Sequence, residues 1–245
     1  MIPPEITIES AQRTLFVLAM IALGLFLLSS LAHLYFVYKE NETGRRLTKI
    51  IPLSFLSLSS LFLMAGYSIL FLPAIFGFLF SIVGDFLLLY KKRGNHYLLL
   101  GIFAFFLAHV AFLMAIGAFF PDYASFFPWG LLYLPGMAVL IAYPMYRFTK
   151  KNRPITVAGS VYFAFVTSLF FFFLLRLFDG KTPFSLAETL IGLFGAALFA
   201  LSDGLNAYTL FRKDIRRRDF YIMLPYLGAQ LLLYLSFILL PIFGL

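Results

Sequence analysis

The 245-residue chain contains no cysteine and few charged residues. Without cysteine it has no disulfide, thiolate zinc site or thiol nucleophile, which excludes cysteine-dependent enzymes. Only 12% of the residues are charged, whereas 62% are hydrophobic, compared with ~45 to 50% in a typical soluble domain. This composition predicts an integral membrane protein. The net charge of +8 arises from basic residues dispersed between apolar segments, so we expect no nucleic-acid binding.

Long apolar segments follow one another through the whole sequence. A helix needs roughly 20 apolar residues to cross the hydrocarbon core of a bilayer, where lipid offers no partner for unsatisfied backbone groups. Eight segments are suitable, at about 14–38, 50–70, 74–90, 96–119, 129–146, 155–177, 185–211 and 220–243. We therefore predict an all-α fold in which residues 1–245 form one transmembrane domain, a single bundle of eight helices.

The 19 Lys and Arg residues predict how the bundle is oriented. All but Arg13, Arg176 and Lys181 lie in or beside the connections that follow the first, third, fifth and seventh predicted spans. The positive-inside rule then places these four connections in the cytoplasm and both termini outside. In a bacterium, the protein would lie in the cytoplasmic (inner) membrane.

Two aspartates interrupt apolar segments, Asp85 in "SIVGDFLLLY" and Asp203 in "ALFALSDGLNAY". An ionised Asp at the centre of a span costs ~2.5 to 3.5 kcal/mol, so each must be paired, protonated or hydrated. Asp85 precedes Lys91 by six residues and Asp203 precedes Arg212 by nine, which places both in the cytoplasmic half of the membrane. We interpret them as the centre of a functional site, with a structural role as helix anchors as the alternative.

Other polar residues are predicted at similar depths on several spans. We expect them to line or support a cavity open to the cytoplasm; they are His109, Gln230, Asn206, Lys49, Tyr226, Tyr143 and His33. Asn206 shares a helix face with Asp203 because it lies three residues further on. His109 and Gln230 could equally make interhelical hydrogen bonds, and Lys49 could extend to the membrane surface. By contrast, the outer half has little polar character beyond Glu188.

The order of these elements resembles a known family. Lys49 with Pro52, "GDFLLLY" at 84–90, "FFLAHVAFLMA" at 105–115, "GAALFALSDGLNAY" at 195–208 and "PYLGAQLLLYL" at 225–235 are similar to the YhhN/TMEM86 family of lysoplasmalogenases. The family pattern has Lys and Pro adjacent, whereas this chain reads "TKIIPL". The resemblance implies a multi-span hydrolase that cleaves the vinyl ether of lysoplasmalogens, with Asp85 and Asp203 as its catalytic residues.

Two carboxyl groups suit this chemistry. Protonation of a vinyl ether gives an oxocarbenium ion that water attacks, so one acid and one base suffice, as in glycoside hydrolysis. We therefore expect no metal and no cofactor, and the bilayer and a lysolipid as partners. A proton-coupled transporter or a lipid-binding protein is the alternative, since intramembrane carboxylates also relay protons. An intramembrane aspartyl protease fits less well, because its GxGD motif is absent. The sequence predicts neither the oligomeric state nor the headgroup preference.

Overall fold

The computed structural model describes residues 4–118, 153–178, 185–211 and 215–243, together with 133, 135–136, 138–139 and 142–143. These residues are almost entirely helical and include no β-strand. Seven helical segments among them are long and apolar enough to cross a membrane. The predicted span at 129–146 falls largely outside the described residues, so the predicted number of eight stays a prediction.

The helices follow the predicted spans closely. In chain order they are α1 (Pro4–Tyr38), α2 (Glu42–Thr48), α3 (Ile51–Gly66), η1 (Ile69–Phe71), α4 (Leu72–Leu89), η2 (Lys91–Arg93), α5 (Asn95–Ala118), α7 (Arg153–Arg176), α8 (Leu186–Phe211), α9 (Arg218–Tyr234), η4 (Leu235–Leu239) and α10 (Leu240–Phe243). The short helix α2, which leads into α3, was not predicted.

Local sequence signals explain where several helices begin. Pro52 and Pro73 occupy the first turns of α3 and α4, where a missing backbone N–H costs least. Asn41 caps α2 by accepting a hydrogen bond from the Gly44 N–H at 2.9 Å. Ser185 and Glu188 form a reciprocal capping box at the start of α8, which fixes the first turn of this helix.

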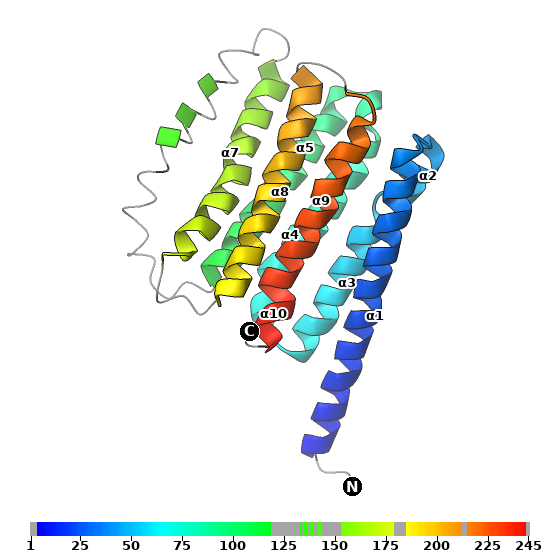
Figure 1. Cartoon of the computed structure of the whole chain (residues 1–245), viewed down its shortest axis with the longest axis vertical. Coiled ribbons are helices and arrows are strands. Elements are labelled where there is room, and N and C mark those ends of the chain that lie inside the picture. The colour runs from blue at the N-terminus through cyan, green and yellow to red at the C-terminus, as the bar shows by residue number, and fades with distance from the viewer. Residues whose placement is uncertain are drawn as a thin grey trace.

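The long helices pack side by side as one bundle (Figure 1). Helices that follow one another in the chain pack together, most extensively α1 with α3, α4 with α5, and α8 with α9. Helix α7 packs between α5 and α8. Helix α1 begins and α10 ends at the lower end of the bundle in Figure 1, whereas α2 lies at the opposite end. The side of the membrane that each end faces stays a prediction.

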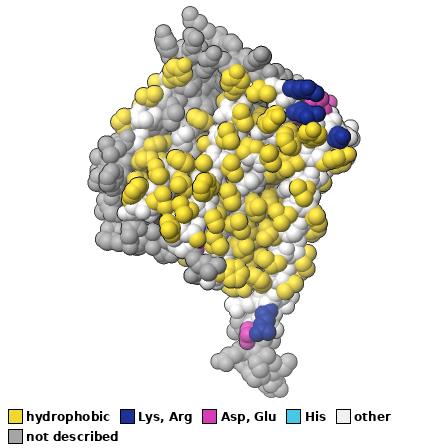
Figure 2. Space-filling model, viewed as in Figure 1, with side chains coloured by type: hydrophobic (Ala, Val, Ile, Leu, Met, Phe, Trp, Pro, Cys, Tyr) yellow, Lys and Arg dark blue, Asp and Glu magenta, His cyan; other side chains and the backbone are white. Residues whose placement is uncertain are grey.

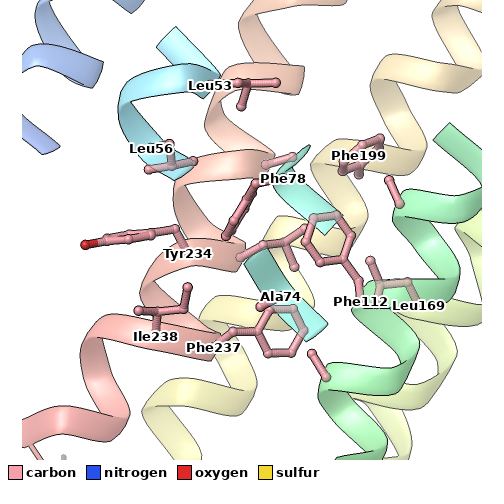
Figure 3. Packing of buried hydrophobic residues seen from close by; sticks show 14 of the residues in the cluster. Leu53, Leu56, Ala74, Phe78, Phe112, Leu169, Phe199, Tyr234, Phe237 and Ile238 are labelled. Atoms are coloured by element: carbon pink, nitrogen blue, oxygen red, sulfur yellow. The ribbon is translucent and has the colours of Figure 1, made fainter. Parts of the chain in front are cut away.

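Aromatic side chains fill the centre of the bundle (Figure 3). Phe78 on α4 meets Phe112 on α5 edge to face, with ring centroids 5.4 Å apart, and Phe112 stacks on Phe237 at 6.1 Å. Phe78, Phe112, Phe237 and Tyr234 have no accessible surface. The Tyr234 hydroxyl is satisfied by Ser59 at 2.7 Å. This aromatic core joins α3, α4, α5, α9 and η4, and the one hydroxyl among its four rings, that of Tyr234, has a partner.

The outer surface is mostly hydrophobic, unlike the surface of a soluble protein. Figure 2 shows hydrophobic side chains over most of the described face, with Lys and Arg confined to its two ends. Leu28 and Leu31 on α1 and Phe103 on α5 are each more than half exposed. Such a continuous apolar belt between charged ends fits a lipid environment.

Candidate functional site

A cavity of about 820 Å³ opens at the end of the bundle that contains α2 and η2. Side chains from α1, α2, α4, α5, α7, α8 and α9 contribute to its wall. Six of the residues selected from the sequence line it: His33, Lys49, Asp85, Asp203, Asn206 and Tyr226. Segments far apart in the chain therefore meet at one site.

Asp85 lies in the wall of this cavity and is only 2% exposed. One carboxylate oxygen, Oδ1, lies 3.2 Å from Nζ of Lys49. The other, Oδ2, accepts a hydrogen bond from the hydroxyl of Tyr226 at 2.8 Å. A buried carboxylate is costly unless it is paired and hydrogen-bonded, and Asp85 is both.

Asp203 has a different environment on the same cavity. It is half-buried, and its Oδ2 accepts a hydrogen bond from the Tyr162 hydroxyl on α7 at 2.6 Å. Among the described residues no Lys or Arg forms an ion pair with it. Asp203 is therefore the more accessible of the two carboxyl groups and the one held by a neutral donor alone.

The two aspartates face one cavity. Asp85 lines it from α4 and Asp203 lines it from α8. Each is fixed by the hydroxyl of a buried tyrosine from a different helix, Tyr226 for Asp85 and Tyr162 for Asp203. Two carboxyl groups that share a confined space but differ in their partners can hold different protonation states.

His109 and Gln230 are fully buried but are not among the residues that line the cavity. The Nδ1–H of His109 donates to the carbonyl of Phe105 at 2.9 Å, and its ring packs edge to face against Tyr162 at 5.4 Å. Gln230 donates to Ser81, one turn before Asp85, at 3.2 Å. Both side chains thus support the layer beneath the site.

Three more of the supporting residues, Lys49, His33 and Tyr143, have separate outcomes. Lys49 is buried and paired with Asp85, so the interpretation that it extends to the membrane surface is wrong. His33 is buried on α1, and its Nδ1 lies 2.8 Å from the Thr48 hydroxyl, which donates to the Gly44 carbonyl. Tyr143 is 57% exposed and does not line the cavity, so nothing in its position supports a role at the site.

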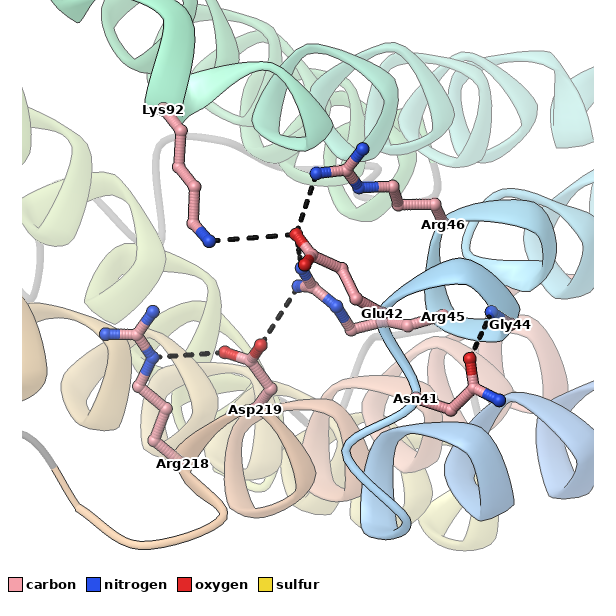
Figure 4. Close-up of polar contacts among 8 residues, drawn as sticks. All are labelled: Asn41, Glu42, Gly44, Arg45, Arg46, Lys92, Arg218 and Asp219. Carbon is pink, nitrogen blue, oxygen red and sulfur yellow. Dashed lines mark hydrogen bonds and ion pairs between the residues drawn. The ribbon is translucent and has the colours of Figure 1, made fainter.

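Charged residues form a cluster beside the mouth of the cavity (Figure 4). Asp219 at the start of α9 pairs with Arg45 of α2 at 2.9 Å and with Arg218 at 3.2 Å. Glu42 pairs with Arg46 at 2.7 Å, with Lys92 at 3.7 Å and with Arg45 at 4.0 Å. These pairs join α2, η2 and the start of α9 at the same end of the bundle.

Lys91 lies next to this cluster, between α4 and α5, and lines the cavity. Burial, reinforced by the positive charges of Lys49, Arg218 and Arg45, lowers the pKa of its ammonium to about 8. The nearby carboxylate of Asp219 opposes this shift. Lys91 therefore stands in a locally positive environment.

A glycine adjoins each aspartate, and the two have different surroundings. A Cβ added at Gly84 would lie 2.6 Å from the Phe105 ring, so only glycine lets α4 approach α5 this closely. A Cβ at Gly204 would meet no atom within 4 Å, and Gly204 lines the cavity. The "GD" element thus serves packing, whereas the glycine after Asp203 leaves space at the site.

The opposite half of the bundle is more polar than the sequence suggested. Arg176 near the end of α7 and Glu188 near the start of α8 are 2% and 4% exposed, respectively. The predicted span at 155–177 already included Arg176, and α7 ends at this residue. The expectation that this half has little polar character beyond Glu188 therefore missed one buried charged side chain, Arg176.

The chemistry available to the cavity rests on carboxyl, hydroxyl and amine groups. No group of three His, Asp or Glu side chains in the described part of the chain could hold a metal ion. Tyr162 is a site residue that was not selected from the sequence. Tyrosine occurs 14 times in this chain, and no local signal distinguishes a tyrosine that bonds to an aspartate on another helix.

Comparisons with known proteins place the chain in one family. No curated protein and no solved structure matches it. A family model, that of the YhhN family, matches residues 44–237, which include both aspartates and all but one of the residues selected for the site. Because this match covers most of the 245 residues, the chain belongs to the YhhN family.

Proposed function

We propose that the protein is a membrane-embedded hydrolase that cleaves the vinyl ether bond of lysoplasmalogens. The observation that carries this proposal is the meeting of Asp85 and Asp203 in one cavity, each fixed by a tyrosine and only one paired with a lysine. Membership of the YhhN family supports a lysoplasmalogenase-like activity. The products would be a fatty aldehyde and a glycerophospho-base.

The two carboxyl groups have different proposed roles. The ammonium of Lys49 stabilises negative charge on Asp85, which suits a general base. Asp203 has greater access to the cavity and a neutral partner, which suits a proton donor that contacts the substrate. This division follows the general rule that neighbouring carboxyl groups in unlike environments supply an acid and a base at the same pH.

The reaction can be written so that both groups return to their starting states. Asp203 gives its proton to the β-carbon of the vinyl ether, and the electron pair of the double bond forms the new C–H bond. Water attacks the oxocarbenium carbon and gives a proton to Asp85, which produces a hemiacetal. Asp85 then protonates the ether oxygen as its bond to carbon breaks, while Asp203 takes the proton of the hemiacetal hydroxyl. The aldehyde and the glycerol alcohol leave.

The cavity wall also suits a single-chain lipid. Leu88 of α4, Ile102 and Phe105 of α5, and Phe163 of α7 provide apolar lining. Polar and charged residues lie toward the mouth, among them Asn206 and Asp219. A lysolipid could place its chain against the apolar lining and its headgroup at the mouth, with the ether bond between them.

A proton-coupled transporter is the second candidate, because Arg176 and Glu188 are buried at the opposite end of the bundle. Buried ionisable groups within a membrane often mark a proton pathway. However, fully buried aromatic side chains on the same two helices, Phe173 of α7 and Phe199 of α8, lie between these residues and the cavity. The hydrolase is therefore the better-supported function.

Product analysis in D₂O tests the proposed reaction. Purified protein in detergent would be incubated with a lysoplasmalogen, and the aldehyde would be reduced at once to its alcohol to prevent exchange. Protonation at the β-carbon predicts one deuterium on the carbon next to the former carbonyl. Absence of aldehyde, combined with proton uptake by proteoliposomes on lipid addition, would favour the transporter instead.

A further inference from the structure

The mouth of the cavity carries more positive than negative charge. Lys91, Arg45 and Arg218 line it, and Asp219 is the acidic residue that lines the same region. Glu42, which pairs with Arg45 at 4.0 Å as well as with Arg46 and Lys92, is half exposed and does not line the cavity. Deeper in the cavity, the charge of Lys49 is matched by Asp85. The excess positive charge therefore faces the opening.

The side chains of Lys91 and its neighbour Lys92 differ in exposure and in ion pairing. A role in orienting the protein in the membrane does not by itself explain the position of Lys91. The side chain of Lys92 is 74% exposed and pairs with Glu42, as a lysine that only orients a membrane protein could. Lys91 is half-buried, lines the cavity and forms no ion pair among the described residues. Holding an ammonium there without a partner is unfavourable, which its lowered pKa of about 8 reflects. An anion at the mouth would relieve this cost.

Two helices also begin at this opening. Asn95, the first residue of α5, and Arg218, the first residue of α9, both line the cavity. Helix N-termini carry partial positive charge, which adds to the attraction of the basic side chains for an anion. The basic side chains and the two helix N-termini thus both favour the binding of an anion at this opening.

We propose that Lys91, together with Arg45 and Arg218, binds the phosphate of a single-chain phospholipid at the cavity mouth. The identity of the lipid rests on the proposed function, but binding itself does not depend on hydrolysis. The site would select substrates that carry a phosphate over neutral single-chain glycerolipids.

The spacing along the chain is compatible with this role. Lys91 follows Asp85 by six residues, which corresponds to about 9 Å along a helix. In a lysoplasmalogen, six bonds separate the reactive ether carbon from phosphorus, an extended length of about 7 Å with single bonds near 1.5 Å. A phosphate held by Lys91 would therefore leave the vinyl ether at the depth of the aspartates.

Binding of a lipid that cannot react tests the proposal separately from the hydrolase. The probe is a 1-O-alkyl-lysophosphatidylcholine, whose saturated ether has no double bond to protonate, and the reference is the 1-O-alkylglycerol that lacks the phosphocholine. Loss of a charged hydrogen-bond partner predicts about tenfold weaker phospholipid binding for Lys91→Gln. Lys91→Arg and the matched control Lys92→Gln should stay within about twofold of the unmodified protein. Alkylglycerol affinity should be equal in all four proteins, which also verifies that each is folded.

The pH dependence provides a second readout. Lys91 faces Lys49, Arg45, Arg218 and Asp219, and its ammonium loses its charge as the pH rises through about 8. The phosphocholine group keeps its charges over this range, so affinity for the phospholipid should fall between pH 7 and 9 in the unmodified protein and not in Lys91→Arg. Inorganic phosphate distinguishes a free anion from a lipid headgroup: competition only at far higher concentration supports a lipid site. Equal phospholipid affinity in Lys91→Gln and Lys92→Gln, or an equal loss of alkylglycerol binding in Lys91→Gln, would overturn the proposal.

Discussion

The ammonium of Lys49 lies 3.2 Å from the carboxylate of Asp85, and both side chains are at least nine-tenths buried. Lys49 lies between α2 and α3, whereas Asp85 lies near the end of α4. The pair therefore connects the first part of the bundle to the wall of the cavity. It also distinguishes Asp85 from Asp203, which has no such partner among the described residues.

Replacing Lys49 with Met should destabilise the protein. The change leaves the negative charge of Asp85 buried without its partner, which costs about 3–5 kcal/mol in other proteins. Thermal unfolding in detergent, followed by far-ultraviolet circular dichroism, should show a clearly lower Tm. The control Lys92→Met removes an exposed pair and should change the Tm little. The combination Lys49→Met with Asp85→Leu should regain stability but no activity; continued instability would argue against the pair as the cause.

Replacing Tyr162 with Phe should slow turnover. The change removes the hydroxyl that stabilises the carboxylate of Asp203, so proton transfer from Asp203 becomes less favourable. A hydrogen bond to a charged group contributes about 1.5–3 kcal/mol, which corresponds to roughly ten- to a hundredfold in kcat. KM should change little, because the ring remains.

Tyr133→Phe is the matched control for this variant. The Tyr133 hydroxyl bonds to the Ala164 carbonyl at 2.9 Å and does not line the cavity. A similar loss of kcat in both variants would show that α7 needs these two tyrosine hydroxyls for its packing, and not that Tyr162 acts through Asp203.

The two glycines beside the aspartates should respond differently to alanine. Gly84→Ala forces a methyl group against Phe105, whose ring packs edge to face on Tyr226 at 6.0 Å. Such overpacking costs about 1–3 kcal/mol and would also disturb the partner of Asp85. Gly204→Ala adds a methyl group to open space and should fold normally. The Tm of each variant in detergent tests this; equal values would contradict the close approach of α4 and α5.

Much of the fold could be predicted from the sequence because lipid imposes simple rules. Backbone groups within a bilayer must be satisfied locally, so helix positions follow from the length of each apolar segment. The two aspartates could be selected for the same reason, since a carboxyl group in an apolar span is costly and needs an explanation. The shared cavity of Asp85, Asp203 and Asn206 agrees with this reasoning.

The details that depend on side-chain packing could not be predicted. Lys49 was expected in a connection, but α2 brings it back toward α4 and into contact with Asp85. Tyr162 became recognisable only once α7 lay beside α8. His109 was expected at the cavity, but its ring turns toward Phe199 and Tyr162 in the layer below. In each case, depth along a span was predictable, whereas the direction of the side chain depends on the neighbouring helices.

Aldehyde release from a lysoplasmalogen by purified protein, compared with Asp203→Asn and Asp85→Asn, tests the central claim most directly. Asparagine keeps the size of aspartate but neither gives nor takes the proton, so each substitution should lower kcat by at least ~10². Because the pair acts as a unit, the double variant should be little slower than the slower single one. The account predicts robust release by the unmodified protein and almost none by folded variants. Near-normal release by folded Asp203→Asn and Asp85→Asn proteins would contradict it.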